Sequence, residues 1–132
     1  MTQEQKELLI KDLCARLPYG VKAYVKNWSK LDRKYYEGVY TVESIHPSLN
    51  TILVYSGRFS VEVIVGYDDY EIKPYLFPLS SMTEEQRLEY YGTFSLSGDI
   101  SGAVDFYNKY HLDWRGLIPM GLAIDATGLN IY

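Results

Sequence analysis

Three residues whose side chains could carry out acid–base chemistry occupy alternate positions late in the chain: His111, Asp113 and Arg115. In an extended segment, alternate side chains point to the same side. A histidine beside a carboxylate can act as a general base, and an arginine can hold an anion. A catalytic site also needs a nucleophile or a ligand, and the neighbouring sequence offers neither. We therefore expect Asp113 to pair with Arg115, and a partly positive His111 to close the C-terminus of a helix.

Cations are interleaved with aromatic rings in a second stretch, which runs from Lys22 to Tyr36. The candidate binding residues in it are Lys22, Tyr24, Lys26, Trp28, Tyr35 and Tyr36. A surface that binds single-stranded nucleic acid needs aromatic rings that stack on the bases and lysines that contact the phosphates. The whole chain carries a formal charge of −4, which disfavours nucleic acid. We expect mainly a solvated strand face and loop here, and we rank nucleic acid below protein as a partner.

Motifs for nucleotide, metal or hydrolase chemistry are absent from the sequence. It contains no GxxxxGK followed by Ser or Thr, and no GxGxxG, HExxH or GxSxG. The single cysteine, Cys14, cannot form a disulfide within the chain, and His111 with Asp113 falls short of the three protein ligands of a catalytic zinc. We expect no enzyme activity, no metal and no cofactor. We also expect Cys14 to be a small buried apolar residue.

The composition is that of an ordinary globular chain. Of 132 residues, 47% are hydrophobic and 23% are charged, which suits one domain with its own core. The first residues resemble a charged helix rather than a leader, and the longest apolar run, residues 116–124, is too short to span a bilayer. We expect a cytoplasmic protein that does not bind membranes. Its 14 tyrosines suit half-buried strands and also interfaces.

A helix over about residues 3–17 is predicted first. Thr2 and Gln5 form a capping box before leucines at helical spacing, and Pro18 ends the helix. Alternation then predicts strands over 21–26, 38–45, 51–56, 59–65 and 70–73. We expect the polar segment 27–37 to be a long loop and Pro74 to stop the last strand.

Five short strands joined by tight turns favour a small SH3-like β-barrel over residues 19–74, with an OB-type barrel as the competitor. A second capping box, Thr83 to Gln86, opens a short helix to about residue 91. A loop over 92–98 and a third helix over about 100–110 follow, and then an apolar tail, which we expect to pack on the protein's own core. The predicted fold is α+β, a single domain over 1–132 made of an N-terminal helix (1–18), the barrel (19–74) and a helical annex with the tail (75–132).

Three blocks of the sequence carry a family resemblance: KELLIKDLCARLPYGVK (6–22), IKPYLFPLSSMTEEQ (72–86) and HLDWRGLIPMGLAIDATGLNIY (111–132). In this order they resemble a family of short uncharacterised proteins from gut bacteria of the Bacteroides group and from their phages and mobile elements. In the last block, Leu112 and Trp114 stand where the family has Phe and Tyr. The resemblance implies a genomic setting, and it carries no activity and no functional residue.

Together these observations favour a non-catalytic protein-interaction module with an unknown protein partner, of the phage or mobile-element origin that the resemblance implies. A small-barrel protein that binds nucleic acid through the basic and aromatic face is the alternative. A small enzyme built on His111, Asp113 and Arg115 ranks third, and it requires a concave pocket at His111.

Overall fold

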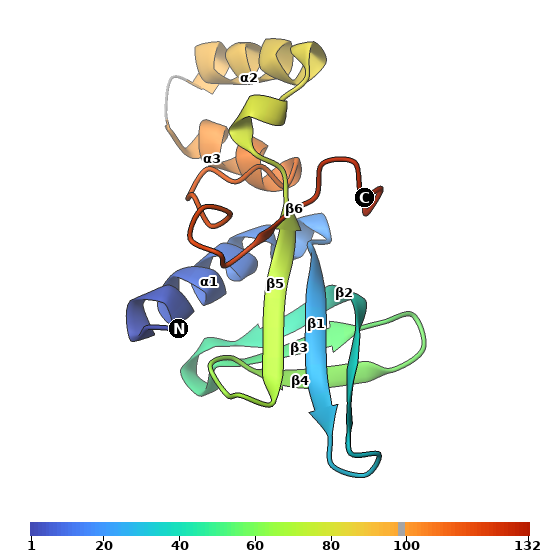
Figure 1. Ribbon diagram of the computed structural model, residues 1–132. Helices are drawn as coiled ribbons and strands as arrows, with labels where there is room; N and C mark the ends of the chain where they lie inside the picture. Colours follow the sequence, from blue (N-terminus) through green and yellow to red (C-terminus); the bar gives the residue numbers. More distant parts are fainter. Residues whose placement is uncertain (98–99) are drawn as a thin grey trace.

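The computed structural model describes residues 1–97 and 100–132 (Figure 1). Its helices and strands are α1 (Gln3–Arg16), β1 (Lys22–Ser29), β2 (Lys34–His46), β3 (Thr51–Tyr55), β4 (Ser60–Ile64), β5 (Tyr70–Leu76), α2 (Glu84–Ser97), α3 (Ile100–Lys109) and β6 (Ile124–Asp125). Single turns of 3-10 helix lie at Leu17–Tyr19, Pro47–Leu49 and Leu79–Ser81. The predicted α+β class, with an N-terminal helix and two later helices, is confirmed.

The described strands form one mixed sheet in the order β4-β3-β2-β1-β5-β6, in which only β5 and β6 pair in parallel. The predicted closed barrel is wrong, because β4 and β5 do not pair and diverge from their connecting turn (Figure 1). Helix α1 provides the cover that a β4–β5 ladder would have given. Its Leu9 and Leu13 are buried in one cluster with Val63 of β4 and Ile72 of β5.

The hairpin of β1 and β2 is longer than expected. Residues 27–37, predicted as a loop, are strand apart from the turn at 30–33. Trp28 lies opposite Tyr35 in the ladder, and their rings meet edge to face with centroids 4.9 Å apart. Cross-strand aromatic pairs stabilise a ladder even where most of its residues are polar. Arg33, with φ of 53°, takes the left-handed conformation in the tight turn.

Strand β5 continues through Pro74 to Leu76, although the sequence predicted that it would stop at the proline. The Asp69 carbonyl accepts the Trp28 N–H at 2.9 Å, so odd-numbered residues of β5 turn their backbone groups toward β1. Pro74 therefore lies with its nitrogen on the opposite edge, where no ladder donor is needed. The same edge receives β6, because the Leu76 carbonyl accepts the Ala126 N–H at 2.8 Å.

Helix α1 begins with the predicted capping box: the Gln5 N–H donates to Thr2 Oγ1 and the Thr2 N–H donates to Gln5 Oε1. Its buried face carries Asp12 and Arg16 in addition to leucines. Cys14 is exposed, contrary to expectation. The reason is that the core-facing stripe passes through residues 9, 12, 13 and 16, and this stripe places Cys14 on the opposite side of the helix.

The tail packs on the protein's own core, as expected. Leu117 and Leu122 are buried with Leu76 of β5, and Leu8 of α1 packs against this cluster. Helix α2 extends to Ser97 and so occupies most of the predicted loop over 92–98, of which residue 98 lies outside the described residues. None of the helices in the described ranges has the length and apolar character needed to cross a membrane.

Candidate functional site

The outer face of the sheet gathers five of the six candidate binding residues. They are Lys22, Tyr24, Lys26 and Trp28, which occupy alternate positions along β1, and Tyr35, which lies opposite Trp28 on β2. The Lys26 ammonium lies over the half-exposed Tyr35 ring, 4.6 Å from its centroid. Tyr36 faces the other side of the sheet, because successive strand residues alternate, and its hydroxyl donates to Asp32.

Carboxylates separate the cations on this face. Lys26 has Glu37 beside it on β2 and Glu71 beside it on β5. Glu71 pairs with Lys73 at 3.4 Å. The Tyr24 hydroxyl donates to Glu37 at 2.5 Å, and this bond, helped by burial, raises the pKa of Tyr24 to about 12. The face is therefore mixed in charge, and the basic character that the sequence suggested is largely compensated.

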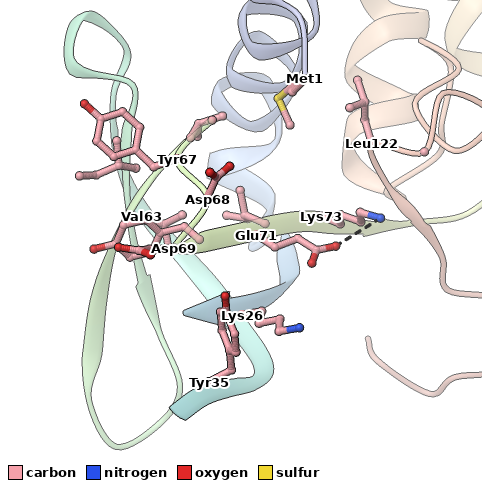
Figure 2. Close-up of a pocket in the computed structure, with 16 residues that line it drawn as sticks. Met1, Lys26, Tyr35, Val63, Tyr67, Asp68, Asp69, Glu71, Lys73 and Leu122 are labelled. Carbon is pink, nitrogen blue, oxygen red and sulfur yellow. Dashed lines mark ion pairs between the residues drawn. The ribbon is translucent and has the colours of Figure 1, made fainter. Parts of the chain in front are cut away.

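A groove of about 320 Å³ follows β5 and the turn that joins it to β4. Figure 2 shows Lys26 and Tyr35 on one side of this strand and Met1 and Leu122 on the other. Two of the predicted binding residues thus form one wall of a concave site. The opposite wall comes from Met1, which precedes α1, and from Gly121 and Leu122 of the apolar tail.

The turn between β4 and β5 gives this groove an acidic end. Asp68 and Asp69 line it and are exposed, and Tyr67 beside them is 62% exposed (Figure 2). No cation of the described residues forms an ion pair with either aspartate, whereas Glu71 is compensated by Lys73. The two aspartates give this end of the groove negative charges without an ion pair, and the Lys6 ammonium lies close to Gly66 of the same turn.

The predicted polar cluster does not form one site. Its three residues, His111, Asp113 and Arg115, contact different parts of the protein. His111 has a φ of 57°, so the segment is not extended there and the three side chains do not share one side. The Asp113 carboxylate accepts the backbone N–H groups of Leu117 and Ile118 at 2.8 and 2.9 Å. The predicted pair between Asp113 and Arg115 is therefore wrong, because this carboxylate caps the turn that follows it.

Arg115 instead joins a buried ion-pair network on α1. Asp12 and Arg16 are both fully buried, and Asp12 accepts from Arg16 Nε at 2.9 Å and from Arg115 Nε at 3.2 Å. Arg16 Nη2 also donates to the Leu112 carbonyl at 2.7 Å. Arg115 stacks on the Trp114 ring at 4.1 Å. These contacts attach α1 to the segment after α3, which is a structural role.

His111 lines a second cavity, of about 380 Å³. Its backbone N–H donates to the Asn108 carbonyl at 3.2 Å, just after the end of α3. The ring is 8% exposed, and its Nδ1 has no hydrogen-bond partner among the described residues. Burial, together with the charges of Arg16 and Lys22, lowers the pKa of His111 to about 4. The imidazole is therefore neutral at pH 7, unlike the partly positive ring that we expected.

Tyr132 forms the wall of this cavity against which His111 stacks. The ring centroids are 3.8 Å apart and the planes differ by 11°. The Tyr132 hydroxyl accepts the Lys22 N–H at 3.0 Å and donates to the Tyr75 carbonyl at 2.8 Å. Burial raises the pKa of Tyr132 to about 12, so this hydroxyl stays protonated and keeps its donor bond.

Sequence reasoning missed the partners that complete both sites. The sequence marks Asp68 and Asp69 as turn residues, which they are, but their place beside Lys26 follows from the pairing of β1 with β5. Tyr132 reaches His111 only because the tail folds back on β5. Within the described ranges, no cluster of three His, Cys, Asp or Glu side chains could hold a metal ion.

Comparisons with protein-family models, with curated proteins and with solved structures find no match to this chain. The two sites are therefore interpreted from their geometry and charge alone.

Proposed function

We propose that the protein is a non-catalytic interaction module that binds a segment of a partner protein in the groove over β5. The segment is extended and carries apolar side chains and at least one lysine or arginine. The observation that carries the proposal is the presence, in one groove, of the half-exposed Tyr35 ring and of the Asp68 and Asp69 carboxylates, which form no ion pair among the described residues. The family resemblance adds a phage or mobile-element origin to this proposal.

The apolar part of the recognition comes from aromatic rings that are already held in place. Trp28 and Tyr35 contact each other across the strands, and Tyr24 is fixed by its hydrogen bond to Glu37. Rigid tyrosine and tryptophan rings supply contact area at a low entropic cost, which is why interfaces are enriched in them. A segment that packs on Tyr35 therefore needs apolar or aromatic side chains of its own.

An extended backbone suits the free edge of β5. Strand β6 pairs with β5 only at Tyr75 and Leu76, and no other described strand pairs with this edge at Ile72, whose side chain packs inward against α1. An added strand gains affinity from main-chain hydrogen bonds and specificity from alternate side chains.

Strands β1 to β4 pair one after another in antiparallel fashion, as strands do in SH3-like domains. We therefore include a relationship to SH3-like domains in the proposal.

The tip of the β1–β2 hairpin supports nucleic acid as the second candidate. Lys30, Arg33 and Lys34 outnumber Asp32 there, and Trp28 and Tyr35 follow on the adjoining face. Phosphates, however, would meet the carboxylates that flank Lys26 and those at the end of the groove. A basic peptide meets the same carboxylates favourably, and we therefore place a protein segment first.

The test is a selection of random twelve-residue displayed peptides on the immobilised protein, followed by fluorescence-anisotropy titration of synthetic copies. We expect enriched peptides to combine apolar residues with lysine or arginine. The double variant D68N/D69N should weaken their binding at least threefold, because it removes the charges that they contact. The matched control, E84Q/E85Q, removes two charges at the start of α2 and should leave binding unchanged.

Peptides without cations, or equal binding by D68N/D69N and the parent protein, would overturn the proposal. A labelled 20-nucleotide oligothymidylate measures the second candidate in the same assay. Affinity that falls steeply with salt, and weakens in K30S/R33S, would replace the protein partner with nucleic acid.

A further inference from the structure

We propose that the cavity beside His111 binds a small planar anion, of the class of aromatic carboxylates. The cavity is separate from the groove over β5 and shares no lining residue with it. Its volume of about 380 Å³ lies in the range of small-molecule sites. The proposal does not depend on the proposed function.

Aromatic rings form the walls of the cavity. Phe77, Tyr110 and Tyr132 line it together with the His111 ring. Phe77 lies 5.9 Å from Tyr132 between ring centroids, and His111 stacks on the same tyrosine. A flat ligand can stack on such walls, whereas a bulky aliphatic one would leave gaps against them.

The polar groups at the mouth of the cavity are mainly donors. Thr83 and Gln86 form the capping box of α2, in which Gln86 Oε1 accepts the Thr83 N–H at 2.9 Å. That bond occupies the amide oxygen of Gln86 and leaves its NH₂ group as a donor. The positive end of the α2 dipole lies at the same place, next to Glu84 and Glu85 of the first turn, which offset part of it. A ligand that accepts hydrogen bonds therefore suits this mouth.

Three cations lie at or near the cavity. Lys109 lines it, the Lys22 ammonium lies 5.9 Å from the centroid of the Tyr132 ring, and Arg16 is close enough to act electrostatically on His111. Among the described lining residues, no side chain is a carboxylate. Glu89 pairs with Lys109 at 3.1 Å but is not part of the lining. Lys109 is the cation that a ligand anion would meet in the cavity, because Arg16 is paired with Asp12 and the Lys22 ammonium donates to the Ile131 carbonyl.

His111 is the second, independent sign of a ligand site. It is more than nine-tenths buried, it lines the cavity, and its Nδ1 lacks a partner. Buried polar atoms are nearly always hydrogen-bonded, so an exception calls for an explanation. Because the Nδ1 nitrogen has almost no accessible surface, a ligand in the cavity would contact the other edge of the neutral imidazole, which can donate or accept one hydrogen bond.

The experiment titrates the full chain with benzoate and with benzamide, its uncharged analogue of the same shape, by ligand-observed saturation-transfer NMR. We expect benzoate to bind with a dissociation constant on the order of 1 mM, as suits a ligand of its size. Benzamide should bind at least threefold more weakly. Signals of His111 and Tyr132 in the protein spectrum should shift in step with benzoate occupancy.

Three variants sharpen the test. H111N keeps a residue type that tolerates the left-handed backbone and should abolish binding of both compounds. K109M, at an exposed position, should weaken benzoate at least threefold and leave benzamide unchanged. K30M, which removes the same charge at the distant hairpin tip, is the matched control and should bind like the parent.

The proposal fails if benzoate shows no saturable signal, or if benzamide binds as tightly as benzoate. It also fails if K109M weakens both compounds equally, or if a folded H111N still binds benzoate like the parent. Should H111N not fold, K109M and the matched ligand pair still decide the question, because Lys109 makes its ion pair on the surface.

Discussion

The ring of His111 lies flat on the ring of Tyr132, with centroids 3.8 Å apart. This contact joins the end of α3 to the folded-back tail and removes the imidazole from water. Desolvation first, and the nearby charges of Arg16 and Lys22 next, lower the pKa of His111 from 6.5 to about 4. The uncharged ring is thus the form that the folded protein stabilises.

Acid should therefore weaken the fold through His111. Between pH 6.5 and about 4 the unfolded chain takes up a proton at this residue and the folded chain does not. The free energy of unfolding should fall as the pH drops through this window, by up to about 1.4 kcal/mol per pH unit. Urea unfolding at several pH values measures it. H111N should lack this part of the slope, and an identical slope in both proteins would contradict the assignment.

Asp12 is the anchor of the buried ion-pair network. Asp12→Asn should lower the free energy of unfolding by about 3–5 kcal/mol, because it leaves the buried Arg16 without its counter-ion. The double variant D12L/R16M removes both charges and should be more stable than D12N in urea unfolding. If D12N costs no more than a surface substitution, the network does not contribute as the geometry indicates.

Trp28 and Tyr35 should stabilise the hairpin as a pair. A double-mutant cycle with Trp28→Ala and Tyr35→Ala should give a coupling free energy of about 0.5–1.5 kcal/mol, as is usual for edge-to-face rings. Equilibrium unfolding of the two single variants and the double variant supplies the values. Strictly additive losses would mean that the two rings do not meet in solution.

Cys14 should react in the folded protein. Its side chain is exposed on α1, so a thiol reagent such as Ellman's reagent should label it without denaturant. Partial burial raises the pKa of the Cys14 thiol, so labelling should be slower than for a free cysteine at the same pH. The labelling time course at pH 8, with and without urea, checks this. Labelling that requires urea would show that the thiol is buried.

Local sequence patterns predicted the helix starts and strand faces that neighbouring residues determine. The capping boxes at Thr2 and Thr83 place the starts of α1 and α2, and alternation along β1 separates its buried face from its outer face. Five of the six candidate binding residues consequently share one surface. Tyr36 does not, because the hairpin continues through the segment that we expected to be a loop, and alternation turns it away.

The remaining features depend on contacts between distant parts of the chain. The barrel stays open because α1, more than forty residues before β4 and β5 in the chain, fills the gap between them. Pro74 is accommodated only because β1 pairs with the other edge of β5. Arg115 finds Asp12, rather than Asp113, across 103 positions of sequence. No local pattern contains this information.

Hydrogen bonds between residues far apart in the sequence also affect how the chain folds. Arg16 meets the Leu112 carbonyl 96 residues away, and the Lys22 N–H meets Tyr132 at a separation of 110. A high contact order makes the entropy of loop closure a large part of the barrier, so refolding should take milliseconds to seconds. The hairpin, with neighbours close in sequence, can form early. The stacked imidazole and phenol would then be among the last contacts made, and they would report the final kinetic phase.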